Sequence, residues 1–172
     1  RVTQNSIEEL HAHEVDFLEE FDLQQTNVAE ACHFPNCEFN GAAIFVEAQM
    51  KNDVVFSNST FHSGVNMQSS DQKSPNFNEC EFHELAIFDQ SYFTGQANFT
   101  LCKFFYTARF ISVDFNAVSF SGSEFLSEVD FQRVYFRRTI WLTSSDASEE
   151  PISTGEDFMR FRVPGGNSTE GR

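Results

Sequence analysis

The sequence predicts an all-β protein, a four-sided β-helix of about six coils, and two observations carry this prediction. A large apolar residue, nearly always Phe, recurs every five or six residues from Phe17 to Trp141. A small or β-branched residue stands two positions before almost every one of them. Residues i and i−2 share a face only in an extended chain, so each unit is a short strand with both side chains directed inward. An unbroken short-period repeat of this kind is typical of a solenoid.

We name the place of the large residue the axial position and the place two residues before it the small position. The series has 24 axial positions, of which 18 are Phe and one, Gln72, is polar. In chain order the axial residues are Phe17, Leu23, Val28, Phe34, Phe39, Phe45, Met50, Phe56, Phe61, Met67, Gln72, Phe77, Phe82, Phe88, Phe93, Phe99, Phe104, Phe110, Phe115, Phe120, Phe125, Phe131, Phe136 and Trp141. The phenylalanines from Phe34 to Phe136 form the predicted structural core.

The step lengths indicate four faces. Every six-residue step starts from an odd-numbered axial position, as from Phe17 to Leu23 or from Phe39 to Phe45, so the extra residue falls at two opposite corners of a square. Twenty-four axial positions over four faces make six coils, roughly 29 Å long at about 4.8 Å per coil. An α-helix does not fit, because a five-residue step turns it by about 140° and would divide the Phe residues between two opposite stripes.

Several units carry an acidic or amide residue between the small and the axial position. They read VDF at residues 15–17, 113–115 and 129–131, and ANF at residues 97–99. This pattern resembles the pentapeptide-repeat family, whose consensus is small–Asp/Asn–Leu/Phe–x–x, over roughly 125 of the 172 residues. The resemblance implies a right-handed quadrilateral β-helix, a handedness that the spacing alone does not give. The alternation of five and six residues and the excess of Phe depart from the consensus and indicate a Phe-rich branch with corner insertions.

The chain divides into three parts by composition. Residues 1–14 are expected to form an N-terminal cap, residues 15–142 the β-helix, and residues 143–172 an acidic, irregular and partly disordered C-terminal tail. Ser6 followed by Glu9 is a capping box, which predicts a short helix over residues 5–15. The polar run around Gln72 predicts a looser or looped corner in the middle of the rod.

The chain is strongly acidic, with a formal net charge of −15. The coil region holds 17 acidic and 7 basic residues, and Arg133, Arg137 and Arg138 cluster near the last coil. This balance disfavours direct binding to nucleic acid and allows a basic protein partner, although solubility alone also explains it. No apolar stretch is long enough to cross a membrane, so no membrane span is expected.

All four cysteines occupy small positions, which indicates a packing role rather than metal binding. Cys80 and Cys102 fall on the same face in adjacent coils, within disulfide reach, so both a thiol pair and a disulfide are open. Asn58 and Asn98 begin N-glycosylation sequons and are candidate glycan sites, or ordinary polar residues of the repeat. The compartment is undetermined.

The sequence shows no catalytic constellation, and we expect no enzyme activity, no metal site and no cofactor, although the His11-x-His13 pair could bind a metal. His62 and His83 each follow an axial Phe in adjacent coils, so they are expected to stack on the surface with Glu84 beside them. Four aromatic residues point outward in this register and, with two in the tail, are the candidate partner contacts. They are Tyr92, Phe105, Tyr106, Tyr135, Phe158 and Phe161.

These observations favour a non-catalytic structural or protein-interaction module, a rigid acidic rod that binds a protein partner; a homodimer or a place in a larger assembly is open. The family resemblance implies a first alternative, a DNA mimic that inhibits or protects a DNA-binding enzyme such as gyrase. The basic last coil departs from that pattern. A second alternative is a lumenal or extracellular recognition domain, because the FxxCxF units at residues 34–39 and 77–82 resemble those in the lumenal β-helix of synaptic vesicle glycoproteins.

Overall fold

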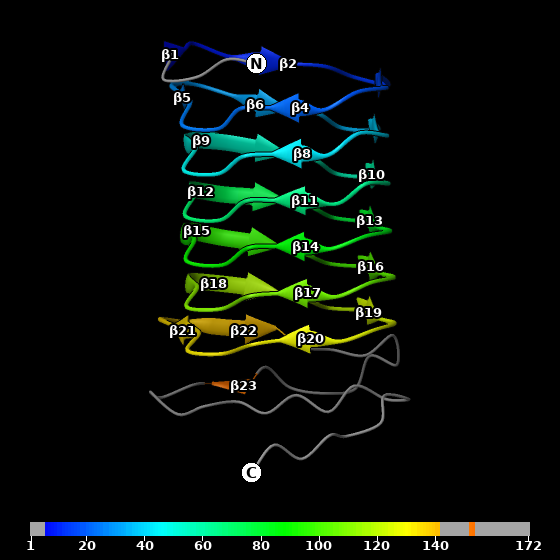
Figure 1. Cartoon of the computed structure of the whole chain (residues 1–172). Helices are drawn as coiled ribbons and strands as arrows, with labels where there is room; N and C mark the ends of the chain where they lie inside the picture. The colour runs from blue at the N-terminus through cyan, green and yellow to red at the C-terminus, as the bar shows by residue number, and fades with distance from the viewer. Residues whose placement is uncertain (1–5, 142–151, 154–172) are drawn as a thin grey trace.

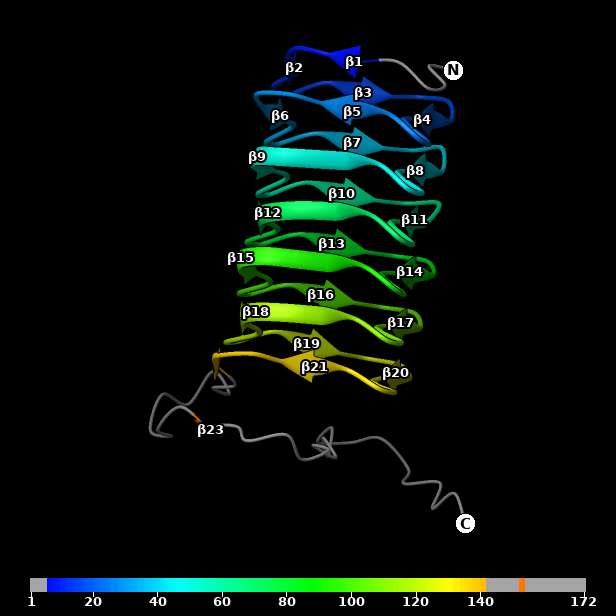
Figure 2. The same ribbon diagram turned by 90° about the vertical axis from the view of Figure 1, so that its left-hand side faces the viewer.

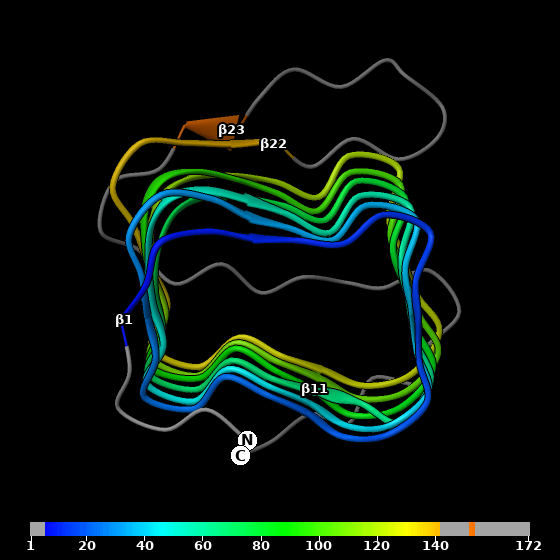
Figure 3. The same cartoon turned by 90° about the horizontal axis from the view of Figure 1, so that it is seen from above.

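A computed structural model describes residues 6–141 and 152–153 as a β-solenoid of about six turns (Figure 1). In this part of the chain the regular elements are all strands. Seen from the N-terminal end, the coils superpose as a rounded square, and the chain runs clockwise as it recedes (Figure 3). The solenoid is therefore right-handed, and the predicted four-sided β-helix is confirmed.

Two faces of the square are separate six-stranded parallel sheets, in which each coil adds one two-residue strand below the last (Figures 1 and 2). Face 1 consists of β3 (Asp16–Phe17), β7 (Glu38–Phe39), β10 (Thr60–Phe61), β13 (Glu81–Phe82), β16 (Lys103–Phe104) and β19 (Glu124–Phe125). Face 2 consists of β4 (Phe21–Asp22), β8 (Ala43–Ile44), β11 (Val65–Asn66), β14 (Ala86–Ile87), β17 (Ala108–Arg109) and β20 (Val129–Asp130).

The third sheet covers faces 3 and 4, because four of its strands run through the corner between them. These are β9 (Gln49–Val55), β12 (Asp71–Asn76), β15 (Tyr92–Asn98) and β18 (Asp114–Ser119). Shorter strands extend face 3, namely β1 (Ser6–Ile7), β5 (Asn27–Val28) and β21 (Tyr135–Phe136), and face 4, namely β2 (Leu10–His11), β6 (Cys32–His33) and β22 (Thr139–Trp141). The last strand, β23 (Ile152–Ser153), pairs antiparallel with β22.

The axial side chains fill the interior as stacked columns. On face 1 the column is Phe in every coil, and neighbouring rings such as Phe82 and Phe104 lie nearly parallel with centroids 4.6 Å apart. Of the predicted core, the residues from Phe34 to Phe120 are buried, while Phe125, Phe131 and Phe136 in the last full coil are partly buried and pack against them. These phenylalanines therefore face inward, and their exposure rises at the C-terminal end.

The two pairs of opposite corners differ, as the step lengths predict. After each even-numbered axial position the chain makes a tight turn, with a backbone hydrogen bond such as Ala48 N to Phe45 O (3.1 Å). The second residue after the axial one has positive φ, as in Glu47 (56°) and Asn58 (55°). The six-residue steps occupy the other two corners. Where β12 has one residue fewer than β9, the register shifts between Gln72 and Ser74, so the corner absorbs the difference as a bulge.

The helix predicted over residues 5–15 is wrong. Residues 6–11 form β1 and β2, and backbone bonds such as Leu10 N to Ala31 O (2.8 Å) tie them to the next coil. A helix of about ten residues is marginal alone, whereas β5 and β6 offer an unpaired edge to which a strand can add. Ile7 extends the axial column of face 3 by pairing with Val28, so the repeat begins one half-coil earlier than predicted.

Two further predictions are corrected by the register. The run around Gln72 is a six-residue strand, β12, rather than a looped corner, and Gln72 itself lies fully buried in the axial column. Trp141 pairs with Ser119, and Ile140 pairs with the small residue Val118, so Trp141 is one place away from an axial position. Most of the predicted tail lies outside the described residues.

Candidate protein-interaction surface

The outward side of face 1 carries a second set of stacked side chains. In each coil the residue after the axial Phe points away from the axis, and these residues lie above one another because the sheet is parallel and in register. We name this column the outer ladder. Its members from the N-terminal end are Leu18, Asn40, His62, His83, Phe105 and Leu126.

The middle of the outer ladder stacks closely. The rings of His62 and His83 are 5.1 Å apart at 30°, and those of His83 and Phe105 are 4.5 Å apart at 18°. The predicted stacking of the two histidines is confirmed. Their hydrogen-bonding carboxylates, however, are Glu38, 2.6 Å from His62 Nε2, and Glu81, 3.2 Å from His83 Nε2, rather than Glu84.

The four outward aromatic residues within the coils are exposed, but they do not form one cluster. Tyr92, Phe105, Tyr106 and Tyr135 are 58%, 38%, 53% and 65% exposed. Phe105 and Tyr106 follow the axial residue of face 1, whereas Tyr92 and Tyr135 lie on the opposite face 3. Two separate surfaces therefore carry exposed aromatics. Phe158 and Phe161 lie outside the described residues.

On face 3 the tyrosines are separated by a charged residue. Asp114 lies between Tyr92 and Tyr135 in the parallel register. Its carboxylate accepts two hydrogen bonds from Arg137, including one from Nε at 2.6 Å. One arginine of the basic C-terminal cluster is thus engaged within the protein, and the apolar surface on face 3 is interrupted.

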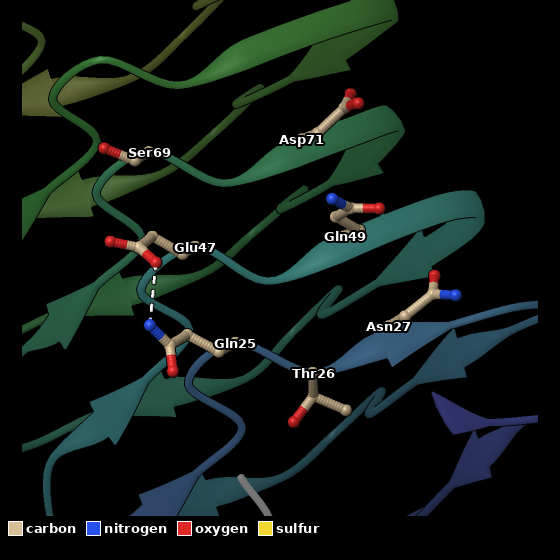
Figure 4. Close-up of a pocket in the computed structure, with 7 residues that line it drawn as sticks. All are labelled: Gln25, Thr26, Asn27, Glu47, Gln49, Ser69 and Asp71. Atoms are coloured by element: carbon tan, nitrogen blue, oxygen red, sulfur yellow. Dashed lines mark hydrogen bonds between the residues drawn. The ribbon is translucent and has the colours of Figure 1, made fainter. Parts of the chain in front are cut away.

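Face 3 also has a shallow polar hollow of about 450 Å³ nearer the N-terminus. Figure 4 shows Asn27, Gln49 and Asp71 in a column on successive strands, with the corner residues beside them. Gln25 Nε2 donates to Glu47 Oε2 at 2.9 Å across the corner. The hollow is open and lined by amides, hydroxyls and two carboxylates, without an apolar floor, so it has few of the features of a small-molecule site.

The cysteines are buried free thiols. Cys80 Sγ donates to Phe56 O at 2.8 Å, and Cys102 Sγ donates to Phe77 O at 2.9 Å. Burial raises the pKa of Cys32 and Cys102 to about 12 and raises the pKa of Cys80 well above its ordinary value. Thiols held protonated in this way are poor nucleophiles and metal ligands, which fits the packing role expected for them.

The two candidate glycan sites differ in their surroundings. Asn58 is exposed at a corner, and its Nδ2 donates to Asn36 Oδ1 at 2.7 Å. Asn98 is partly buried in β15, where its Nδ2 donates to Asn76 Oδ1 at 3.1 Å and its Oδ1 accepts from Thr100 N at 3.0 Å. Glycosylation at either asparagine stays a prediction, and Asn58 is the less enclosed of the two.

Within residues 6–141 and 152–153, no three side chains among His, Cys, Asp and Glu are grouped so as to hold a metal ion. The same part of the chain has no helix that could span a membrane.

A family model described as pentapeptide repeats (9 copies) matches residues 23–71. Residues 23–71 therefore consist of repeats of the pentapeptide-repeat family. The parallel register carries the same frame beyond the matched residues, from Ile7 in the first strand to Phe136 in the last full coil. No curated protein and no solved structure matches the chain in the corresponding comparisons. The family match accounts for the fold, so evidence about the function has to come from the residues of the outer surface.

Four exposed apolar residues were not among the predicted contacts, namely Val15 and Leu18 at the N-terminal end of face 1 and Leu101 and Leu126 nearer its C-terminal end. Leu126 is 56% exposed next to Phe105 in the outer ladder, and Leu101 is 50% exposed at the corner that leads into face 1. The signal was present in the sequence, because the residue after each axial Phe on face 1 is readable every 21 or 22 positions. The predicted contacts include outward aromatic residues only, and these residues are aliphatic.

Proposed function

We propose that this pentapeptide-repeat protein is a non-catalytic interaction module, a rigid acidic rod whose outer surface binds a protein partner. The observation that supports it is the set of exposed apolar side chains that the fold does not use. The interior columns are complete without Phe105, Tyr106 and Leu126, which lie outside the square. Large apolar side chains gathered on an otherwise charged surface are characteristic of protein contacts.

The parallel architecture suits such a role. Each coil is hydrogen-bonded to the coils on both sides, so the side chains of a face are held in a fixed array along the rod. A partner that binds this array meets a preorganised surface and pays little entropy to order it. We infer a binding role in which the rod presents contacts and performs no chemistry.

DNA mimicry has less support from the charge distribution. A mimic needs carboxylates that continue along one face, as the phosphates of a duplex do. On face 1 the outward residues before the axial Phe are Asp16, Glu38, Thr60, Glu81, Lys103 and Glu124, so Thr60 and Lys103 interrupt the column. Other carboxylates, such as Glu47 and Asp114, are on faces 2 and 3. We therefore prefer the protein-binding proposal, and the lumenal alternative depends on glycan at Asn58 or Asn98.

The test is affinity purification of the tagged chain from its native source at low salt, followed by mass spectrometry and quantification of every co-purifying chain. We expect a stoichiometric protein partner. The matched control is a bait in which Tyr92, Phe105, Tyr106 and Tyr135 are each replaced by Ser, since these exposed residues are outside the core.

Loss of the partner from the control bait, with an unchanged thermal unfolding midpoint, would support the proposal. A protein that purifies alone at low salt, or a partner retained equally by both baits, would count against it. Recovery of a DNA-handling enzyme that duplex DNA displaces would favour the mimicry alternative instead.

A further inference from the structure

The chemistry of the outer ladder changes along the rod. Its N-terminal part is mixed, with Leu18 followed by the polar Asn40 and the hydrogen-bonded His62 and His83. Its C-terminal part is apolar, because Phe105 stacks on His83 and Leu126 follows in register. Tyr106 lies beside Phe105. We name Phe105, Tyr106 and Leu126 the Phe105 patch.

Carboxylates surround the Phe105 patch. Glu84 occupies the position equivalent to Tyr106 in the preceding coil. Glu124, on β19, comes two residues before Leu126, and Glu128 comes two residues after it. All three glutamates are exposed. The nearest base on the face is Lys103, and its Nζ is 3.4 Å from Glu81 Oε1. Its charge is therefore shared with a carboxylate of the same face. The Phe105 patch is an apolar surface with a negative rim.

The tyrosines of face 3 do not provide an equivalent surface. Asp114 stands between Tyr92 and Tyr135 and binds Arg137, so an apolar side chain placed there would meet an ion pair rather than a second apolar residue. On face 1 two consecutive coils present Phe105 and Leu126 without an intervening charge in the ladder. Face 1 is therefore the better candidate for a binding surface than face 3.

We propose that the Phe105 patch docks a basic segment of a partner protein, in which an apolar side chain packs on Phe105 and Leu126 while Lys or Arg side chains contact the glutamate rim. This proposal rests on the proposed function and names the partner class for it. Charge complementarity selects the occupant, because a second copy of this face would bring its carboxylates against like charges. The aromatic and aliphatic anchors supply affinity, and the rim supplies orientation and salt dependence.

The experiment uses the full chain and four synthetic 12-residue peptides that combine Leu or Ser with Lys or Glu in alternation. Binding is measured by fluorescence polarisation at low and at moderate salt. We expect the Leu/Lys peptide to bind best and to weaken with salt. With the F105S/L126S variant its affinity should fall by about tenfold or more, as for the loss of central apolar contacts.

The matched control is the Y92S/Y135S variant, which removes exposed aromatics from face 3 without changing the net charge. It should bind the Leu/Lys peptide as the wild type does. A second pair of variants, E84Q and E128Q, should weaken binding of the Leu/Lys peptide and reduce its salt dependence. Both positions are exposed, so these changes leave the fold intact, as the thermal midpoint will show.

Equal binding of the Leu/Lys peptide to wild type and F105S/L126S would overturn the proposal, since attraction to an acidic rod would then explain it. Preference for a Glu-containing peptide would also overturn it. The proposed function can fail separately: a native partner that is lost with Y92S/Y135S and retained with F105S/L126S would leave a binding module standing and move its site to face 3.

Discussion

The strands of face 1 carry two ladders of stacked side chains on opposite sides of one sheet. In the inner ladder, Phe82 and Phe104 are 4.6 Å apart and fully enclosed. In the outer ladder, one residue beyond the ends of these strands, His83 and Phe105 are 4.5 Å apart and face the solvent. The backbone imposes the same stacking on both. The difference shows that stacking is a property of the parallel register, while burial decides which stack holds the protein together.

The inner ladder should dominate stability. Phe104→Ala removes a buried ring between Phe82 and Phe125 and should lower the free energy of unfolding by about 3–5 kcal/mol, because the surrounding coils cannot close the cavity. Phe105→Ala, the adjacent residue outside, should change it by about 0.5 kcal/mol or less. Urea denaturation of the two variants measures this difference. Similar losses from both would mean that the outer ladder is part of the core.

A second expected difference concerns titration, because the interior carries thiols with raised pKa values. Cys32, Cys80 and Cys102 stay protonated in the folded protein above pH 9, where the unfolded chain ionises them. The unfolded state then binds fewer protons, so stability falls as pH rises. For Cys32 and Cys102 the stabilisation is fully present below about pH 9 and is lost toward about pH 12, at roughly 1.4 kcal/mol per pH unit for each thiol. Cys80 contributes in the same direction.

Denaturation midpoints between pH 8 and 11 measure this effect against a matched control. Ala occupies the small position elsewhere, as at Ala43 and Ala86, so the C32A/C80A/C102A variant should fold. Its stability should decline less steeply over this range than that of the wild type. Identical slopes would show that groups other than these three thiols cause the alkaline loss of stability.

The interior of the fold was predictable from the sequence because every inward position meets the same demand. A column next to the axis admits a large apolar residue and a small neighbour, and that requirement repeats in each coil. The ends were not predictable in the same way. Leu10 and Ala12 reverse the usual order of small and large residues, so the first coil was not recognised in the sequence. Ser6 with Glu9 indicated a helix, but this segment instead pairs as strands with β5 and β6.

The outer surface was only half predictable. Period counting placed Tyr92, Phe105, Tyr106 and Tyr135 outside, and all four are exposed. It did not assign them to opposite faces, although counting the axial positions in fours places Phe93 and Phe104 two faces apart. The interior demand repeats along the rod and can be read from one unit, whereas the outer ladder varies from Asn40 to Leu126 and has no such rule.

Gln72 is a buried polar residue at an axial position, where the other coils have a large apolar side chain. Its Nε2 donates to Ser70 Oγ at 2.9 Å, while its buried Oε1 has no hydrogen-bond partner among the described residues. Gln72→Met keeps the shape and removes the unpaired acceptor, so it should raise the free energy of unfolding by about 1 kcal/mol. Ser70 Oγ keeps Ser91 Oγ, 3.2 Å away, as a partner. A loss of stability on this change would indicate that the amide is satisfied in solution, by a buried water for example.

The smallest expected effect lies at the edge of the outer surface. Leu101 has φ of 58°, a conformation that costs a side chain with Cβ about 1 kcal/mol and costs glycine little, and the equivalent residue of the next coil is Gly122 with φ of 68°. Leu101→Gly should therefore raise the free energy of unfolding by about 0.5–1 kcal/mol, although it removes an exposed apolar side chain.

The reverse change, Gly122→Ala, is the matched control. Its Cβ would lie 2.7 Å from Leu101 Cδ2 in the same left-handed conformation, so it should be destabilising. Thermal and urea unfolding of both variants measure the pair. If Leu101→Gly destabilised the rod, the exposed Leu101 side chain would have to contribute packing that outweighs the backbone strain. Exposed side chains such as Leu101 would then contribute to the stability of the rod, whereas the comparison of the two ladders on face 1 assigns stability to the inward side chains alone.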